Sequence, residues 1–270
     1  MDLHAVTWNL FHGRDWPPEG EPRLARGRLS GKPLRGKAYE NVNRDLLDQF
    51  AALLSKPPWD VALLQEVPPP WARGLARACG AQRHRALTSR NWLLPVTGLI
   101  GRWRPDLIGS SAGGSNLTLV RPSGGEIAER RTVVLTRRPQ RRVMVLTRLE
   151  SGLRIANVHV STGWTAAERD LLSGAETASD WAGTDPLLFG GDFNVRPRDT
   201  KVYDQVAERF GLAPPTAPDR LSHLLVRGLE VVEHPAAWPP EARDVVDPKT
   251  GLKIRLADHN PVEGIFAQVR

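Results

Sequence analysis

The sequence lacks the features that would place it outside the cell or in a membrane. Cys79 is the only cysteine among the 270 residues, so no intrachain disulfide and no cysteine zinc cluster can form. Residues 1–6 have neither the basic nor the apolar region of a signal peptide. No apolar run approaches the length of a membrane span. These absences predict a reducing, cytoplasmic location and no transmembrane segment.

Acidic residues are also too few to balance the basic ones. There are 30 Asp and Glu against 37 Lys and Arg, which gives a net charge of +7. Most of the basic residues are arginines, which suit bidentate phosphate contacts. Arginines are crowded in residues 14–36, which read as a long surface loop, and in residues 137–142. A run of charge is more often a solvated face than a binding site, so this composition favours polyanionic partners without proving one.

Short apolar runs alternate with helical patterns along the chain. Helices are predicted over residues 38–54, after the prolines at 68–70, from Thr165 (as N-cap, with Glu168 completing a capping box) to Trp181, and over 201–210. Residues 81–113 fit no clear pattern. Strands are expected at 5–8, 60–67, 117–120, 131–138, 142–149, 154–160, 187–189, 221–226, 229–233 and 262–268. The order predicts one α/β domain with mixed sheets over residues 1–270.

Residues 186–197 are the most informative stretch. The apolar run 187–189 ends at Gly190 and Gly191, and Asp192 and Asn194 follow. Two residues apart in an extended segment, these two side chains should point the same way, toward a hard cation or a phosphate. An equally simple interpretation is an Asx turn, in which Asp192 caps its own backbone.

Polar residues recur at the ends of the predicted strands. They are Asn9, Glu66, Asn116, His159, Asp192, Asn194, Asp258 and His259. If these ends cluster, three carboxylates meet in one pocket, and a divalent cation would cancel their repulsion. Each residue alone could cap a turn or sit as a satisfied strand-end side chain, so the argument depends on their joint occurrence.

The motifs, in order, resemble those of the endonuclease/exonuclease/phosphatase superfamily of metal-dependent phosphoesterases. This group includes apurinic/apyrimidinic endonucleases and pancreatic-type deoxyribonucleases. The resemblance spans about residues 3–268 and implies a four-layer α/β sandwich, with two mixed sheets face to face and helices outside. The segments are Thr7-Trp8-Asn9, Leu64-Gln65-Glu66, Asn157-Val158-His159, Gly190-Gly191-Asp192-Phe193-Asn194 and Asp258-His259-Asn260-Pro261-Val262.

The resemblance also implies roles for these residues. Glu66 would be the main ligand of Mg²⁺ or Mn²⁺, assisted by Asn9 and Asp258. Asp192 would orient or deprotonate the attacking water, and Asn194 would hold a phosphate oxygen. His259 would be the general base or a phosphate contact, and His159 would stabilise phosphoryl charge. Asn116, Ser222 and Arg196 are weaker candidates for substrate contact.

One position departs from the family pattern. Where the family usually has an aspartate that hydrogen-bonds the catalytic histidine, this chain has Ser222. A serine cannot stabilise an imidazolium as a carboxylate does, so His259 is expected to be less well oriented and less basic. Asp219 is three residues upstream and is expected to point away.

Several functions stay open on sequence alone. The leading hypothesis is a Mg²⁺-dependent phosphodiesterase acting on a phosphate ester, with nucleic acid as the favoured substrate class. Alternatives are a phosphomonoesterase, a phospholipid-headgroup phosphodiesterase, a catalytically impaired nucleic-acid-binding member, or a scaffold. Neither the natural substrate nor the oligomeric state can be predicted.

Overall fold

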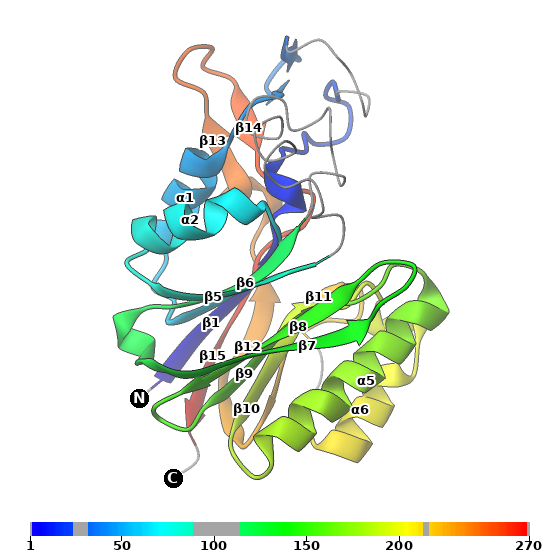
Figure 1. Cartoon of the computed structure of the whole chain (residues 1–270). Coiled ribbons are helices and arrows are strands. Elements are labelled where there is room, and N and C mark those ends of the chain that lie inside the picture. Colours follow the sequence, from blue (N-terminus) through cyan, green and yellow to red (C-terminus); the bar gives the residue numbers. More distant parts are fainter. Residues whose placement is uncertain (1, 24–31, 89–113, 213–215, 269–270) are drawn as a thin grey trace.

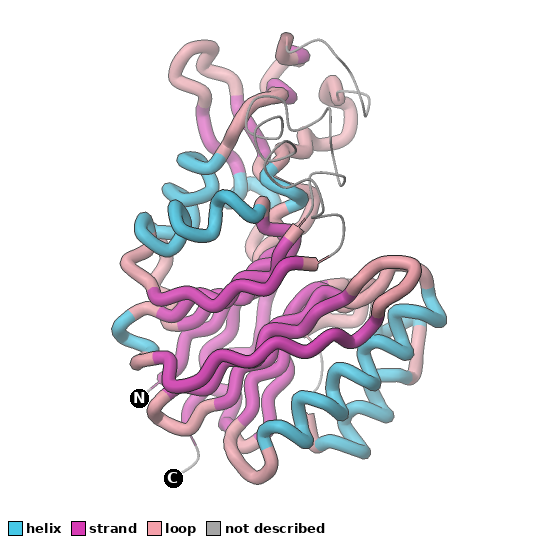
Figure 2. Tube along the Cα trace, in the orientation of Figure 1, coloured by secondary structure: helices cyan, strands magenta, loops and turns pink. Residues whose placement is uncertain are grey.

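Two mixed sheets packed face to face form the centre of the protein (Figures 1 and 2). The computed structural model describes residues 2–23, 32–88, 114–212 and 216–268. The first sheet has the order β12 (Leu229–Ala237), β15 (Val262–Gln268), β1 (Asp2–Asn9), β4 (Val61–Val67), β6 (Ser115–Val120) and β5 (Gln82–Leu87). The second has the order β11 (Ser222–Arg227), β10 (Leu187–Asp192), β9 (Arg154–His159), β8 (Arg142–Leu149) and β7 (Ile127–Thr136).

Helices cover the outer face of each sheet, which completes the four layers (Figure 1). Helices α1 (Leu47–Ser55) and α2 (Ala72–Ala78) lie on the first sheet, and α5 (Trp164–Ala182) and α6 (Val202–Phe210) lie on the second. The predicted α/β sandwich is therefore confirmed. Among the described residues, no helix has the length and apolar character needed to cross a bilayer.

Alternation along the strands explains why both faces of each sheet are buried. In β4, Val61 and Leu63 face the sandwich interior, while Ala62 and Leu64 face α1 and α2. On the outer side, the Phe50 ring packs 5.1 Å from the Trp8 ring and 5.5 Å from the Trp71 ring (centroid distances). Aromatic packing of this kind fixes α1 and α2 over the end of β1.

Two local predictions are wrong, and tertiary contacts explain both. The helix expected over 38–54 begins only at Leu47, because Glu40–Asn41 pairs as β3 with β2 (Leu34–Arg35), and Asp45 accepts the Leu47 N–H at 2.9 Å. Helix α5 begins at Trp164 with no side-chain cap. Glu168 does not complete a capping box and instead accepts a hydrogen bond from the Thr200 hydroxyl.

The segment expected to be a basic surface loop is partly buried. Arg14 and Asp15 are 7% and 3% exposed. The Arg14 guanidinium lies 3.9 Å from the centroid of the Phe11 ring, and the Arg14 carbonyl accepts a hydrogen bond from Ala257 N. Through this hydrogen bond, the start of the segment holds in place the residue that precedes Asp258. Residues 24–31 of the same segment, and residues 89–113, lie outside the described part of the chain.

Candidate active site

The two parallel strand pairs bring the site residues to one edge of the sandwich. In the first sheet, β1 and β4 run parallel and Asn9 is in register with Gln65. In the second, β9 and β10 run parallel and His159 is in register with Asp192. Since parallel strands end at the same edge of a sheet, the side chains at their carboxyl ends lie together.

Asp192 is the centre of the resulting cluster. Its Oδ2 accepts a hydrogen bond from Asn9 Nδ2 at 2.8 Å and lies 3.7 Å from His159 Nε2 and 3.8 Å from His259 Nε2. His159 Nε2 is also 3.9 Å from Glu66 Oε1. The predicted meeting of distant strand ends is thus observed for all five residues.

Asp258 joins the cluster from the turn before β15. Its Oδ1 lies 3.9 Å from His259 Nε2. The turn is fixed from behind, because Trp8 Nε1 donates to the His259 carbonyl at 2.9 Å and Arg243 Nη1 donates to the carbonyls of Leu256 and Ala257 at 3.0 and 2.5 Å. Ala257 has a φ of 57°, so the turn contains a strained residue held by these contacts.

His12 is a further member that sequence reasoning missed. Its Nε2 lies 3.2 Å from Glu66 Oε2, the shortest of the carboxylate–imidazole distances in the cluster. His12 belongs to η1 (Phe11–Gly13) and has a φ of 54°. The available signal was its position three residues after Asn9 and directly before Gly13. A Cβ on Gly13, which has a φ of 74°, would lie 2.3 Å from the Trp71 ring.

Backbone geometry places the two central carboxylates. Glu66 has a φ of 51° and lies in an irregularity of the β4–β6 pairing, between Leu64 and Val67. Gly191 has a φ of 144°, and a Cβ there would lie 1.8 Å from the Val158 carbonyl oxygen. Only glycine lets β10 run this close to β9 directly before Asp192.

Asn194 does not point with Asp192 as predicted. It has a φ of 50°, so the extended strand ends at Asp192 and the alternation of side chains ends with it. Asn194 N donates to Asp192 Oδ1 at 3.1 Å, which is the Asx turn considered as the alternative. Asn194 Nδ2 donates to the Val160 carbonyl at 3.1 Å. One Asp192 oxygen therefore serves the turn, and the other faces the cluster.

Asn116 lies on β6 between Ser115 and Leu117, opposite the irregular part of β4 that carries Glu66. It is fully buried, and its Nδ2 donates to the Val143 carbonyl at 2.7 Å, while its Oδ1 has no hydrogen-bond partner among the described residues. Its role in substrate contact stays a prediction.

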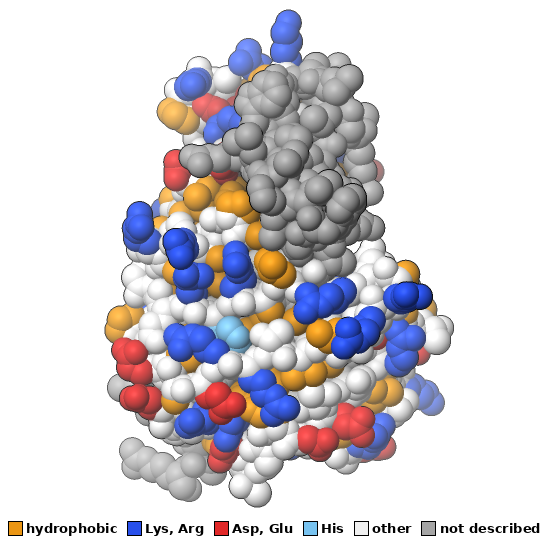
Figure 3. Space-filling model, in the orientation of Figure 1, with side chains coloured by type: hydrophobic (Ala, Val, Ile, Leu, Met, Phe, Trp, Pro, Cys, Tyr) orange, Lys and Arg blue, Asp and Glu red, His pale blue; other side chains and the backbone are white. Residues whose placement is uncertain are grey.

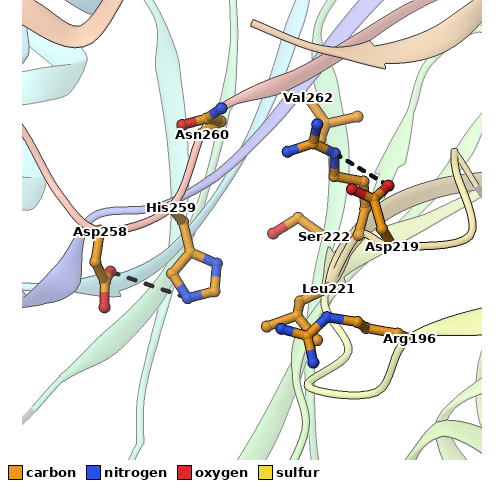
Figure 4. A pocket seen from close by; sticks show the side chains of 9 residues that line it. Arg196, Asp219, Leu221, Ser222, Asp258, His259, Asn260 and Val262 are labelled. Atoms are coloured by element: carbon orange, nitrogen blue, oxygen red, sulfur yellow. Dashed lines mark ion pairs between the residues drawn. The ribbon is translucent and has the colours of Figure 1, made fainter. Parts of the chain in front are cut away.

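A cavity of about 240 Å³ opens beside His259 (Figure 4). It is lined by Ser222 and Arg196, the other two predicted substrate contacts, and also by Arg220 and Asn260. Ser222 points toward the His259 ring, and its Oγ has no hydrogen-bond partner within the described chain. Asp219 is exposed and pairs with Arg220 at 3.6 Å, so it does not replace the missing aspartate.

Mutual electrostatics decide the protonation of the site. Burial raises the pKa of Glu66 and of Asp192, but the neighbouring imidazoles outweigh it and hold both pKa values below their ordinary ones. For His159, burial outweighs the carboxylates and lowers the pKa. For Asp258, desolvation within the cluster and the charge of Glu66 raise the pKa.

The pKa of His259 lies above that of an ordinary histidine. Burial lowers its pKa, but the charges of Asp192 and Asp258 outweigh burial and raise it. These carboxylates stabilise an imidazolium here, and the prediction that Ser222 leaves His259 less basic than an aspartate would stays a prediction.

The donor set fits a hard divalent cation. Glu66 and Asp258 offer carboxylate oxygens, which Mg²⁺ prefers, and the Asn9 amide oxygen, which accepts the Phe11 N–H at 2.9 Å, has a second lone pair for a cation. Among the described residues, no group of three or more His, Cys, Asp and Glu has the spacing of an all-protein metal site. Mg²⁺ needs no such cage, because it binds through one or two carboxylates and keeps several waters.

Comparisons with known proteins agree with this arrangement. Residues 6–259 match the model of the Endonuclease/Exonuclease/phosphatase family. No curated protein matches the chain.

Solved structures with the same fold span nearly the whole chain at low identity. An endonuclease/exonuclease/phosphatase family protein from Bacteroides thetaiotaomicron is 13% identical over 100% of this chain and 99% of its own, with a TM-score of 0.65. Mannosyl-6-phosphatase from the same organism is 13% identical over 98% and 99%, with a TM-score of 0.63. A humanised D. rerio TDP2 is 14% identical over 99% and 99%, with a TM-score of 0.58. Together with the matched family model, the fold and the strand-end cluster show that this chain belongs to the endonuclease/exonuclease/phosphatase family of phosphoester hydrolases.

Proposed function

We propose that the protein is a Mg²⁺-dependent phosphodiesterase that hydrolyses its substrate by in-line attack of water. The observation that carries this proposal is the contact of Glu66, Asp192 and Asp258 with the imidazoles of His159 and His259 at 3.7–3.9 Å. Within the described ranges, no ion pair joins these three carboxylates to lysine or arginine, which suits a divalent cation and a phosphate better than a structural role.

Glu66 is the main candidate to hold Mg²⁺, with Asn9 and Asp258 as further oxygen donors. When bound, the cation would neutralise charge on the phosphoryl oxygens and favour ionisation of a water. Mn²⁺ offers the same chemistry to the same donors. Both ions take oxygen ligands, so the donor atoms of this site do not select one ion over the other.

Asp192 accepts the proton of the attacking water. Its lowered pKa keeps it ionised, and Asn9 and the Asn194 N–H hold its two oxygens in place. As the water oxygen bonds to phosphorus, the water proton passes to Asp192, the bond from phosphorus to the leaving oxygen breaks, and the leaving oxygen takes up a proton from solvent. Asn194 holds the Asp192 carboxylate through its backbone N–H, and its contact with a phosphate oxygen stays a prediction.

His259 acts as a cation at the phosphate. Its raised pKa favours this role over that of general base, since a general base must be neutral when it reacts. His159 has a lowered pKa and is a neutral donor that stabilises charge growing on the phosphoryl oxygens.

Net charge and the cavity give different indications about the substrate. The net charge of +7 and the exposed Arg196 favour a polyanion such as nucleic acid. In Figure 3, however, basic side chains are spread over the visible face among acidic ones. The cavity of about 240 Å³ beside His259 favours the second candidate, a compact phosphomonoester or headgroup ester.

An activity panel tests these alternatives. Plasmid, abasic duplex, RNA, phospholipid and inositol phosphates are each incubated with Mg²⁺, Mn²⁺ or chelator, with Asp192→Asn as the inactive control. Cleavage of polymers supports the leading proposal, and release of phosphate from small esters supports the second. Metal-independent cleavage, or wild-type rates in Asp192→Asn, would contradict both.

A further inference from the structure

The pairing of β4 with β6 contains one extra residue at the active site. Leu64 pairs with Leu117 and Val67 pairs with Ser115, so Gln65 and Glu66 face a single residue of β6. Such a bulge interrupts the ladder and lets Glu66 adopt its φ of 51°. A strained residue of this kind persists only where its surroundings hold it.

A side chain from the opposite sheet fills this bulge. Asn157 of β9 is fully buried, and its Nδ2 lies 3.3 Å from the Leu64 carbonyl oxygen and 3.1 Å from the Leu117 carbonyl oxygen. Both carbonyls belong to residues at the edge of the bulge, and Asn157 donates to them from across the sandwich.

Gln65, on β4, hydrogen-bonds to the same Asn157 side chain from the first sheet. Its Nε2 donates to Asn157 Oδ1 at 2.9 Å, to the Leu63 carbonyl at 2.9 Å and to Thr7 Oγ1 at 3.1 Å. Gln65 precedes Glu66, and Asn157 precedes His159 by two residues, which puts both side chains of β9 on the same face of the sheet. The hydrogen bond between Gln65 and Asn157 therefore links the strand segment that contains Glu66 to the one that contains His159.

We propose that Gln65 and Asn157 are positioning residues that set the separation and orientation of Glu66 and His159 across the two sheets. This inference rests on the proposed hydrolase function. It assigns a task to two motif residues whose side chains do not enter the cluster, and it makes the sandwich interface part of the catalytic apparatus.

The test compares two apolar variants with a matched control. Gln65→Met and Asn157→Leu remove the amide pair with little change in volume. Thr147→Val also removes a buried cross-sheet contact of 2.9 Å, between His84 Nδ1 and Thr147 Oγ1, but leaves the site intact. For each protein, we would measure kcat, KM, unfolding in urea, and the rise in melting temperature on addition of Mg²⁺.

We expect kcat to fall about 10–100-fold in both amide variants, as for other partners that orient ligating residues. The stabilisation by Mg²⁺ should shrink with it, whereas Thr147→Val keeps wild-type kcat and Mg²⁺ response despite its loss of stability. Because the two residues share the hydrogen bond between Gln65 and Asn157, the loss of kcat in the double variant should be smaller than the product of the two single losses. If the apolar variants do not fold, Gln65→Asn should show the same loss of kcat, since it keeps an amide too short to reach Asn157.

Two outcomes would overturn the positioning role. One is wild-type kcat and Mg²⁺ response in the amide variants, with only the stability loss of Thr147→Val. The other is multiplication of the two effects in the double variant. A wild-type protein inactive on every substrate would instead overturn the proposed function.

Discussion

Acidification should destabilise the protein through two histidines buried away from solvent. Burial lowers the pKa of His223 to about 4. Burial and the nearby charge of Arg130 likewise lower the pKa of His84 to about 4. In an unfolded chain, histidine titrates near pH 6.5, so on acidification the unfolded state takes up protons first.

The contacts of His223 explain why its neutral form is favoured. Its Nδ1 accepts the Thr216 N–H at 3.1 Å, and its Nε2 donates to the Arg220 carbonyl at 3.0 Å. A second proton would place one N–H against another. The His223 ring packs against the rings of Phe193 and Tyr203, and His223 is in register with Gly191, directly before Asp192, so its protonation would loosen the wall of the site.

The size and sign of the effect follow from linkage. Stability is complete above pH 6.5 and is lost as the pH falls toward 4. Between pH 7 and pH 5, each histidine should cost about 2 kcal/mol, and the two together about 4 kcal/mol, a large part of a typical 5–15 kcal/mol.

Urea unfolding at pH 7 and pH 5 measures this loss. In His223→Gln, the amide can accept from Thr216 and donate to Arg220, so we expect the loss to shrink by about 2 kcal/mol relative to wild type. The site residues are present in both proteins, so subtracting the pH dependence of His223→Gln from that of wild type cancels their titration. Exposed His234→Gln is the control. An equal pH dependence in His223→Gln and wild type would refute the argument.

Three substitutions test the site directly. Asp192→Asn should lower kcat by about 100-fold or more while circular dichroism and melting temperature stay close to wild type, because the proton acceptor is lost. Gly191→Ala should destabilise the protein by about 3 kcal/mol or more in urea, since the Cβ would collide with the Val158 carbonyl. Ser222→Asp should change kcat by less than about tenfold, because Asp192 and Asp258 already flank His259; a rise of about 100-fold would show that the serine limits turnover.

The strand ends could be predicted from sequence because they depend on local pattern and on the simple rules of sheets. The apolar run of β10, broken by two glycines before Asp192, is readable in one stretch of chain. The strand β8 has the predicted bounds, Arg142–Leu149. In contrast, β5 escaped prediction because its sequence, Gln-Arg-His-Arg-Ala-Leu, is mostly polar, and only its place at the edge of the first sheet makes it a strand.

The direction in which the pKa of His259 departs from the ordinary value could not be predicted from position 222 alone. The missing aspartate at 222 suggested a weaker base, but the pKa of His259 depends on every charge around it. Asp192 comes from β10 and Asp258 from the turn before β15, and their distances of 3.8 and 3.9 Å from His259 Nε2 depend on the fold. The sequence motifs name these residues, but the distances between them come only from the structure.

His12 could not be placed from sequence because its position depends on two unusual backbone conformations. His12 and Glu66 have φ values of 54° and 51°; His12 follows β1, and Glu66 lies in the irregularity within β4. In an extended chain, neither side chain would turn toward the other; only the turn after β1 and the bulge in β4 bring His12 Nε2 to 3.2 Å from Glu66 Oε2. Strand periodicity therefore predicts which face a side chain takes within a regular strand. It does not predict the direction of a side chain whose backbone is left-handed, such as that of His12. The bulge itself is held by Asn157 from the other sheet, so the position of Glu66 is a property of the whole sandwich and not of its own segment.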